Sequence, residues 1–318
     1  MTDAAIRAIP SWAARAARIP GVAWVLPLLL AGFAIVEPGF TSAPNLLNIG
    51  IQSAILLLLA LPMTFVIMSE GLDLSMGALI GLSSVVLALL LVDGQPLSAS
   101  ATAAIGTGLV FGLVNGLLVV HGGIPPFVVT LGTMGVAQGL ALAITDGASV
   151  VGIGSVLPAL YSTTWAGVPF PVVAGTAAYA IFHVLLYHTR YGSYVFAIGG
   201  NREALMLAGV NVNAYHVSIY ALAGAIVGGA GLLLTGRMNA GHPVAGIGLE
   251  FDAIAAAVLG GTERGYGSLP GTLLGVVAVG VLKNGLNLMA VPSSVQVAGV
   301  GLLVLVVLMI DAARRPRS

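Results

Sequence analysis

Long apolar runs follow one another along almost the whole chain, with short polar segments between them. A helix needs about 20 mostly apolar residues to cross a bilayer, and ten segments are candidates by that measure. None alternates with a period of two residues, which argues against transmembrane strands. The eighth segment is short and bounded by glycines, so it is predicted to be a half-helix or to extend upstream. The predicted segments are Gly21–Val36, Leu46–Met68, Ser75–Val92, Ala101–Val120, Pro126–Ile144, Pro171–Tyr187, Tyr215–Leu234, Phe251–Gly261, Leu269–Ala290 and Val295–Ile310.

The composition is that of a protein whose solvent is lipid. Of the 318 residues, 58% are hydrophobic and 7% are charged, whereas soluble domains carry about 25% charged residues. The 44 glycines favour close packing between helices in the membrane. We therefore expect an all-α integral membrane protein without a soluble catalytic domain, organised as a single transmembrane domain over residues 1–318.

Composition and missing motifs exclude several functions. The formal net charge is zero, so no basic face is expected to bind nucleic acid. The absence of cysteine excludes disulfides, thiol nucleophiles and cysteine-ligated metals. The chain has no phosphate loop, no His-Glu-x-x-His and no Gly-x-Ser-x-Gly. We expect no catalytic residues and no cofactor, so an ATPase that drives transport would have to be another chain.

The distribution of lysine and arginine predicts the orientation, since cytoplasmic loops are enriched in both. With both termini in the cytoplasm, nine arginines fall inside and only Arg237 falls outside. No small-residue cleavage site is obvious before the second apolar run, so residues 1–20 are predicted to be a cytoplasmic segment and not a signal peptide. The inside arginines are Arg7, Arg15, Arg18, Arg190, Arg202, Arg264, Arg314, Arg315 and Arg317, and the outside acids are Glu37, Asp93, Asp146 and Glu250.

The two halves of the chain, residues 21–165 and 166–313, resemble each other weakly. Residues 112–117 (GLVNGL) in the fourth segment echo residues 280–286 (GVLKNGL) in the ninth, with one extra residue. Residues 71–75 (GLDLS) and 248–252 (GLEFD) stand at the heads of the third and eighth segments. Five segments per half is an odd number, so we expect two inverted five-helix repeats, which are typical of transporters.

Two acids, Glu70 and Asp73, lie between the second and third apolar segments. Charges close to the hydrocarbon are costly, and they usually face protein or a water-filled path. Gly71 permits a break in the chain, and Asp73 or Ser75 can accept hydrogen bonds from the free N–H groups of the next helix. A helix cap and a place in the translocation path are both compatible with this pattern.

Polar residues also interrupt the fourth and ninth segments. Asn115, Lys283 and Asn284 are candidates for function because intramembrane polar side chains usually have one. The alternative is an interhelical hydrogen bond between the two asparagines. Lys283 is expected to reach the membrane surface or to pair with a carboxylate such as Asp73.

The stretch from Arg237 to Asp252 is predicted to lie outside the membrane. His242 stands eight and ten residues before Glu250 and Asp252, which is no known pattern of metal ligands, so no metal site is expected. A polar rim that meets an external partner and an Arg237–Glu250 ion pair remain as alternatives.

The longest inside loop, Thr189 to Asn213, contains a predicted short helix. Asn201 is a good N-cap, Glu203 suits the first turn and Gly209 suits the position after the last turn. The helix between them would expose apolar residues to water unless something covers them. It therefore either docks a cytoplasmic partner or lies in the lipid interface.

Several segments in the same order resemble the permease subunits of bacterial ATP-binding-cassette importers of the ribose-type monosaccharide family. The resemblance runs from about Asn45 to Asp311. One departure is the inside loop Glu263–Ser268, which is shorter or more charged than expected. The segments that carry the resemblance are residues 63–67 (MTFVI), 71–75 (GLDLS), 115–118 (NGLL), 125–134 (PPFVVTLGTM), 197–201 (AIGGN), 252–256 (DAIAA), 260–262 (GGT) and 284–288 (NGLNL).

The resemblance implies a permease dimer in the bacterial inner membrane, with a cytoplasmic ATPase and a periplasmic sugar-binding protein as partners. It also implies that the ATPase contacts the 201–209 loop, through Asn201, Arg202, Glu203, Ala204, Leu205, Met206 and Gly209. Hydroxyl-rich sugars suit a path of Asn and Thr side chains, for which we expect Asn115, Thr130, Thr133 and Asn284 together with Glu70, Asp73 and Lys283. The alternative is an ion- or proton-coupled transporter that uses Glu70, Asp73 and Lys283.

Overall fold

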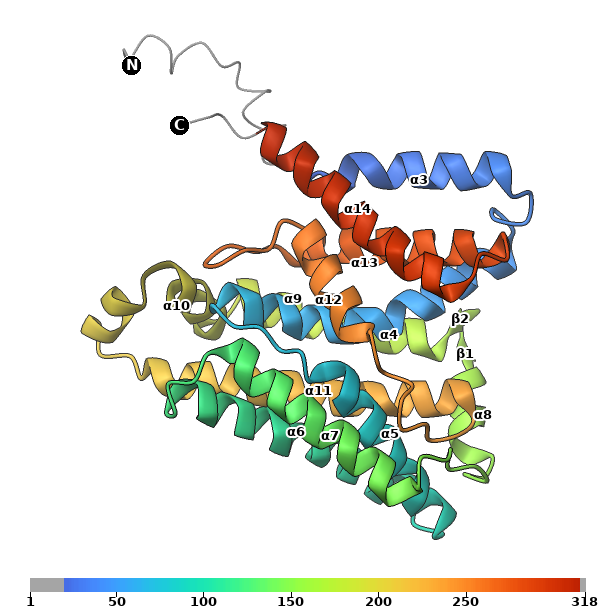
Figure 1. Cartoon of the computed structure of the whole chain (residues 1–318), viewed down its shortest axis with the longest axis horizontal. Coiled ribbons are helices and arrows are strands. Elements are labelled where there is room, and N and C mark those ends of the chain that lie inside the picture. The colour runs from blue at the N-terminus through green and yellow to red at the C-terminus, as the bar shows by residue number, and fades with distance from the viewer. Residues whose placement is uncertain (1–19, 315–318) are drawn as a thin grey trace.

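Each of the ten predicted segments falls on a helix in the structure, a computed structural model that describes residues 20–314 (Figure 1). A short hairpin of β1 (Thr164–Trp165) and β2 (Val168–Pro169) joins the two halves. Arg7, Arg15, Arg18, Arg315 and Arg317 lie outside the described residues. The helices are α3 (Val22–Val36), α4 (Ala43–Met68), α5 (Met76–Val92), α6 (Leu97–Val120), α7 (Pro126–Thr145), α8 (Val156–Ser162), α9 (Phe170–Tyr187), α10 (Arg190–Leu207), α11 (Val212–Met238), α12 (Leu249–Leu259), α13 (Leu269–Leu288) and α14 (Ser293–Arg314).

Among the described helices, seven are long and apolar enough to cross a membrane: α4, α6, α7, α9, α11, α13 and α14. This confirms the all-helical membrane class. The helices α3 and α5 have only 15 and 17 residues, and α12 has 11. Length alone therefore does not establish ten complete crossings.

Local sequence explains many of the helix ends. Proline stands in the first turn of α4, α7, α9 and α13, where its missing N–H has no helical partner to lose. Asp146 and Asn239 end α7 and α11 in the left-handed conformation, with φ of 50° and 52°, which short polar side chains tolerate.

The centre of the bundle is α4, which packs against α9, α11, α12 and α13 (Figure 1). In its most apolar window 83% of the residues are buried, compared with 17% for α14. The large apolar side chains that α14 exposes, Leu302, Leu305 and Met309, are at home in lipid. The apolar content of the chain therefore divides into a packed interior and a lipid-facing surface.

The closest helix pair, α6 and α11, packs through glycines spaced four residues apart. A β-carbon on Gly108 would lie 2.1 Å from the carbonyl oxygen of Gly224, and one on Gly112 would lie 2.3 Å from that of Tyr220. Such contacts require backbone to meet backbone, which only small residues allow in a membrane bundle. The abundance of glycine in the sequence is thus explained in part by this seam.

Replacing Gly108 with alanine should destabilise the bundle by about 1–3 kcal/mol, because the added methyl overpacks a backbone contact. Gly106→Ala is the matched control, since no atom lies within 4 Å of a β-carbon at that position of the same helix. Thermal unfolding in detergent measures the difference. Equal melting temperatures for the two variants would contradict the seam.

Candidate functional site

The two short helices α5 and α12 begin inside the bundle, and their first turns meet. A β-carbon on Gly246, just before α12, would lie 2.0 Å from the carbonyl oxygen of Gly77 in the first turn of α5. With 11 residues, α12 is about 16 Å long, roughly half of the bilayer core. The first turn of each helix has N–H groups without helical partners, and these need acceptors inside the protein.

A chain of buried side chains supplies acceptors at the start of α5. The Asp73 carboxylate accepts hydrogen bonds from the backbone N–H of Ser75 at 2.9 Å and from its hydroxyl at 2.5 Å. The Asn115 amide of α6 donates to the Ser75 hydroxyl at 2.9 Å, and the Thr133 hydroxyl of α7 donates to Asn115 at 2.6 Å. Helix α5 has no side-chain cap on its first-turn N–H groups: Asp73 instead accepts the N–H of Ser75, which itself occupies the N-cap position.

Thr130 lies beside this chain, and its hydroxyl donates to the carbonyl oxygen of Leu72 at 3.2 Å. The structure thus brings together four predicted path residues, Asp73, Asn115, Thr130 and Thr133. Sequence reasoning missed Tyr220 of α11, whose buried hydroxyl oxygen would be 2.4 Å from a β-carbon on Gly71. The glycine in the break therefore makes room for a tyrosine ring.

The start of α12 differs from the expectation. Glu250 was assigned to an outside segment, but its side chain is buried and accepts a hydrogen bond from the N–H of Gly248 at 2.9 Å. The polar-rim interpretation and the Arg237–Glu250 pair are wrong for this reason: the carboxylate faces its own helix start. His242, in the same stretch, instead lies 2.5 Å from the Ser149 hydroxyl.

The charge pair of the interior joins α12 to α13. Lys283 forms an ion pair with Asp252, not with Asp73. Asn284 exchanges two hydrogen bonds of 2.9 Å with Asn45 of α4, so the interpretation that Asn115 and Asn284 bond to each other is wrong. Asn115 and Asn284 each form a hydrogen bond with another part of the bundle, and the neighbouring sequence does not indicate which part.

The weak sequence resemblance between the two halves contains a signal for the charge pair. Aligning residues 71–75 with 248–252 places Ser75 opposite Asp252. Aligning 112–117 with 280–286 places Asn115 opposite the Lys283–Asn284 pair. The Ser75–Asn115 contact of one half therefore corresponds to the Asp252–Lys283 contact of the other.

A cavity of about 760 Å³ opens beside Lys283 and Asp252, between α12, α13 and α14. Its other walls are mostly aliphatic, including Val297, Val300 and Val304, and Phe251 lies at its edge. Lys283 is thus the predicted path residue that borders an open volume. A polar pair against an apolar wall can orient a small polar molecule while leaving it weakly held.

The predicted docking helix is the second part of α10. This helix begins at Arg190 and not at Asn201, where the backbone leaves helical geometry with φ −152° and ψ 81°. Asn201 accepts a hydrogen bond from the Ala204 N–H at 2.9 Å, which confirms it as a cap. Gly209 has a φ of 78°, as a residue beyond the helix end should.

The side chains of this part differ in exposure. Leu205 is buried, whereas Met206 is 50% exposed and Leu207 is 85% exposed. Glu203 and Ala204 also face outward. The exposed apolar pair is therefore Met206–Leu207, so Leu207 joins the predicted contact residues and Leu205 faces the bundle.

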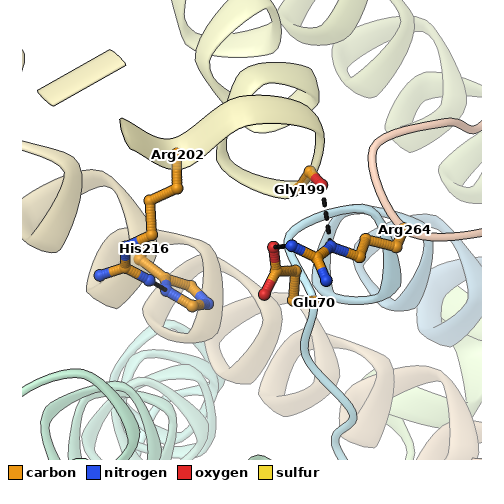
Figure 2. A network of polar contacts seen from close by, with 5 residues as sticks. All are labelled: Glu70, Gly199, Arg202, His216 and Arg264. Carbon is orange, nitrogen blue, oxygen red and sulfur yellow. Dashed lines mark hydrogen bonds and ion pairs between the residues drawn. The ribbon is translucent and has the colours of Figure 1, made fainter. Parts of the chain in front are cut away.

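Polar contacts hold α10 to the rest of the bundle (Figure 2). Arg264, in the connection between α12 and α13, forms an ion pair with Glu70 at 2.5 Å and donates to the carbonyl oxygen of Gly199 at 3.0 Å. On the other side of the break in α10, Arg202 contacts the His216 ring at 3.3 Å. Glu70 thus lies with α10, apart from the Asp73 cluster.

Two short helices that begin inside a bundle and meet there, with polar groups at the meeting point, are features of membrane transport proteins. The chain belongs to the family described as the permease component of branched-chain amino acid transport systems, which matches residues 45–310. Members of this family are transport components, so the chain is not an enzyme.

The curated relatives are sugar permeases. The ribose import permease protein of Bacillus subtilis is 41% identical over 89% of each chain. The D-allose transport system permease protein of Escherichia coli is 32% identical, covering 92% of this chain and 90% of the relative. The L-arabinose ABC transporter permease protein of Azospirillum brasilense is 30% identical over 93% and 88%. No solved structure matches the chain significantly.

Replacing Lys283 with methionine should destabilise the protein by about 3 kcal/mol, because a mostly buried carboxylate loses its partner. The double variant Lys283→Met, Asp252→Asn removes both charges and should recover part of that loss. Thermal unfolding in detergent compares the two. A double variant that is less stable than the single one would contradict the pairing.

Proposed function

We propose that this chain is the membrane-spanning permease subunit of an ATP-driven importer that moves a monosaccharide or similar polyol across the bacterial inner membrane. The observation that carries the proposal is the near full-length similarity to the ribose import permease protein, supported by the allose and arabinose relatives. The chain itself does no covalent chemistry. A cytoplasmic ATPase supplies the energy, and a periplasmic binding protein supplies most of the specificity.

The sugar path runs past the point where α5 and α12 meet. Asp73, Asn115, Thr130 and Thr133 form its polar wall on one side, since their carboxylate, amide and hydroxyl groups can exchange partners with sugar hydroxyls. On the other side the cavity beside Lys283 supports the proposal because it is large and only weakly polar. The amide pair formed by Asn284 stabilises the helices behind this wall.

The bundle consists of two inverted five-helix repeats, over residues 21–165 and 166–313. Corresponding helix pairs support this arrangement: α5 packs on α6, α7 and α11, as α12 packs on α13, α14 and α4. Likewise α6 packs on α7 and α11, as α13 packs on α14 and α4. In this scheme α3, α5 and α12 count as spans although they are short.

Both termini are cytoplasmic, since the described chain begins and ends at the same end of the bundle as α10. Arg264 contacts α10, which carries Arg190 and Arg202. In the same connection, a β-carbon on Gly261 would lie 3.6 Å from Pro20, at the start of the described chain. A shared pocket links this connection to the end of α14. The arginine assigned to the outside stands in the last turn of α11, at its far end.

The second part of α10 docks the ATPase, with Met206 and Leu207 as its apolar contact and Arg202 and Glu203 beside them. The exposure of this pair at the basic end of the bundle leaves it free for a partner, and the family resemblance favours docking over burial in the lipid interface. The binding protein meets the opposite end. A second copy of the permease completes the importer, as the family resemblance implies.

Reconstitution in vesicles tests the function. Together with an ATPase and a binding protein encoded by neighbouring genes, the chain should take up a labelled pentose or hexose only when ATP is present, and a non-hydrolysable ATP analogue is the control. Uptake that needs no ATP and collapses with the ion gradient would replace the proposal with the ion-coupled alternative.

Leu207→Asp should reduce co-purification of the ATPase at least tenfold while leaving the permease folded, since an exposed apolar anchor becomes charged at the centre of an interface. Val151→Asp is the matched control, because Val151 is 68% exposed in the connection between α7 and α8. Unchanged co-purification with Leu207→Asp would exclude this surface as the docking site.

A further inference from the structure

Three segments that are distant in sequence converge at the basic end of the bundle. They are the end of α4 with the break that follows it, the middle of α10, and the connection between α12 and α13. The first segment leads into α5, and the third segment follows α12. Both of these short helices are therefore connected to the basic end of the bundle. The proposed sugar path does not account for this convergence of three segments.

The three segments meet through backbone atoms with no room for side chains. The N–H of Gly265 donates to the carbonyl oxygen of Met68 at 2.9 Å. A β-carbon on Gly199 would lie 1.9 Å from that same oxygen and 2.5 Å from the nitrogen of Gly265. Because backbone cannot yield as a flexible side chain does, a displacement of one segment is passed to the other two.

Arg264 adds a polar connection to this contact. Its guanidinium donates to the carbonyl oxygen of Gly199 and pairs with Glu70, so one side chain spans α10 and the break after α4 (Figure 2). Glu70 stands in the left-handed region with φ 68°, in the turn that ends α4. The Arg264 side chain is 69% exposed, so the pair contributes little to overall stability, and its effect lies in its position.

The break in α10 lies between two attachments. Gly199 is attached to Arg264, and beyond Asn201 the Arg202 guanidinium donates to Asn213 at 2.9 Å and contacts His216 of α11. Non-helical geometry at Asn201 therefore separates a part fixed to the α4–α5 break from a part fixed to α11. Such an element can transmit a hinge movement because its two parts are each rigid.

We infer that Met68, Glu70, Gly199, Arg264 and Gly265 form a coupling joint, through which movement of the ATPase on α10 reaches the break that leads into α5 and the end of α12. This inference rests on the proposed function. It assigns Glu70 to energy coupling and removes it from the sugar path. It also explains the charge in the 263–268 loop, because Arg264 forms the ion pair and the hydrogen bond that connect the parts of the joint.

A charge-neutralising set tests the joint in the reconstituted importer with all its partners. Glu70→Gln and Arg264→Gln should each lower the sugar transported per ATP hydrolysed by about threefold to fivefold, the size expected for a partly exposed ion pair. The double variant should be no worse than either single variant, because both remove the same contact. Asp93→Asn, at the end of α5 and away from the joint, is the control.

The set separates the joint from the proposed function. A wild-type protein that transports without ATP would defeat the proposed function. A wild-type protein that needs ATP, with single variants that keep the wild-type ratio or a double variant that multiplies the single losses, would overturn the joint alone. Variants in which transport and ATP hydrolysis fall by the same factor, so that the sugar transported per ATP is unchanged, also count against the joint.

A glycine pair offers an independent test. Gly199→Ala forces a methyl against two backbone atoms, whereas no atom lies within 4 Å of a β-carbon at Gly200. Gly199→Ala should lower the transport-to-ATP ratio, and Gly200→Ala should leave it unchanged. An assembled Gly199→Ala importer with the wild-type ratio would overturn the joint. If that variant does not assemble, the charge-neutralising set decides.

Discussion

The structure depends on one constraint, which is that a helix cannot begin inside a membrane unless its free N–H groups find acceptors within the protein. Both α5 and α12 begin in this way. The carboxylates of Asp73 and Glu250 accept hydrogen bonds from N–H groups at or beside the two starts. Each buried carboxylate thus binds the residue from which its helix starts, Ser75 for α5 and Gly248 for α12.

The interruptions also organise the surroundings. Where α5 and α12 meet, polar groups replace aliphatic ones, and a cavity opens beside the Lys283–Asp252 pair. At the basic end, the break before α5 and the connection after α12 are held to α10 by Arg264. The meeting point inside the bundle and the contacts at the basic end are therefore connected through the same two helices.

Local patterns in the sequence are sufficient for features that depend on neighbouring residues. The apolar runs locate the helices, and Asn201 and Gly209 mark the ends of the docking segment because capping is a local hydrogen bond or a local φ. Pairings between helices depend on tertiary packing. Asn284 could bond to any amide in the bundle, and nothing near it in sequence points to Asn45. The one sequence signal for the charge pair is the weak resemblance between the two halves, which aligns Ser75 with Asp252 and Asn115 with the Lys283–Asn284 pair.

The Asn45–Asn284 pair has a consequence for how the protein is made. The two residues are 239 positions apart, so at about 5–20 residues per second the ribosome needs roughly 10–50 s to produce the second after the first. Throughout that time Asn45 lacks its partner on α13, although its amide can still donate to the nearby carbonyl oxygen of Phe40, and α6 lacks the glycine face of α11. The early helices have to be sheltered by the insertion machinery or by each other, because the fold that satisfies them is completed only near the end of synthesis.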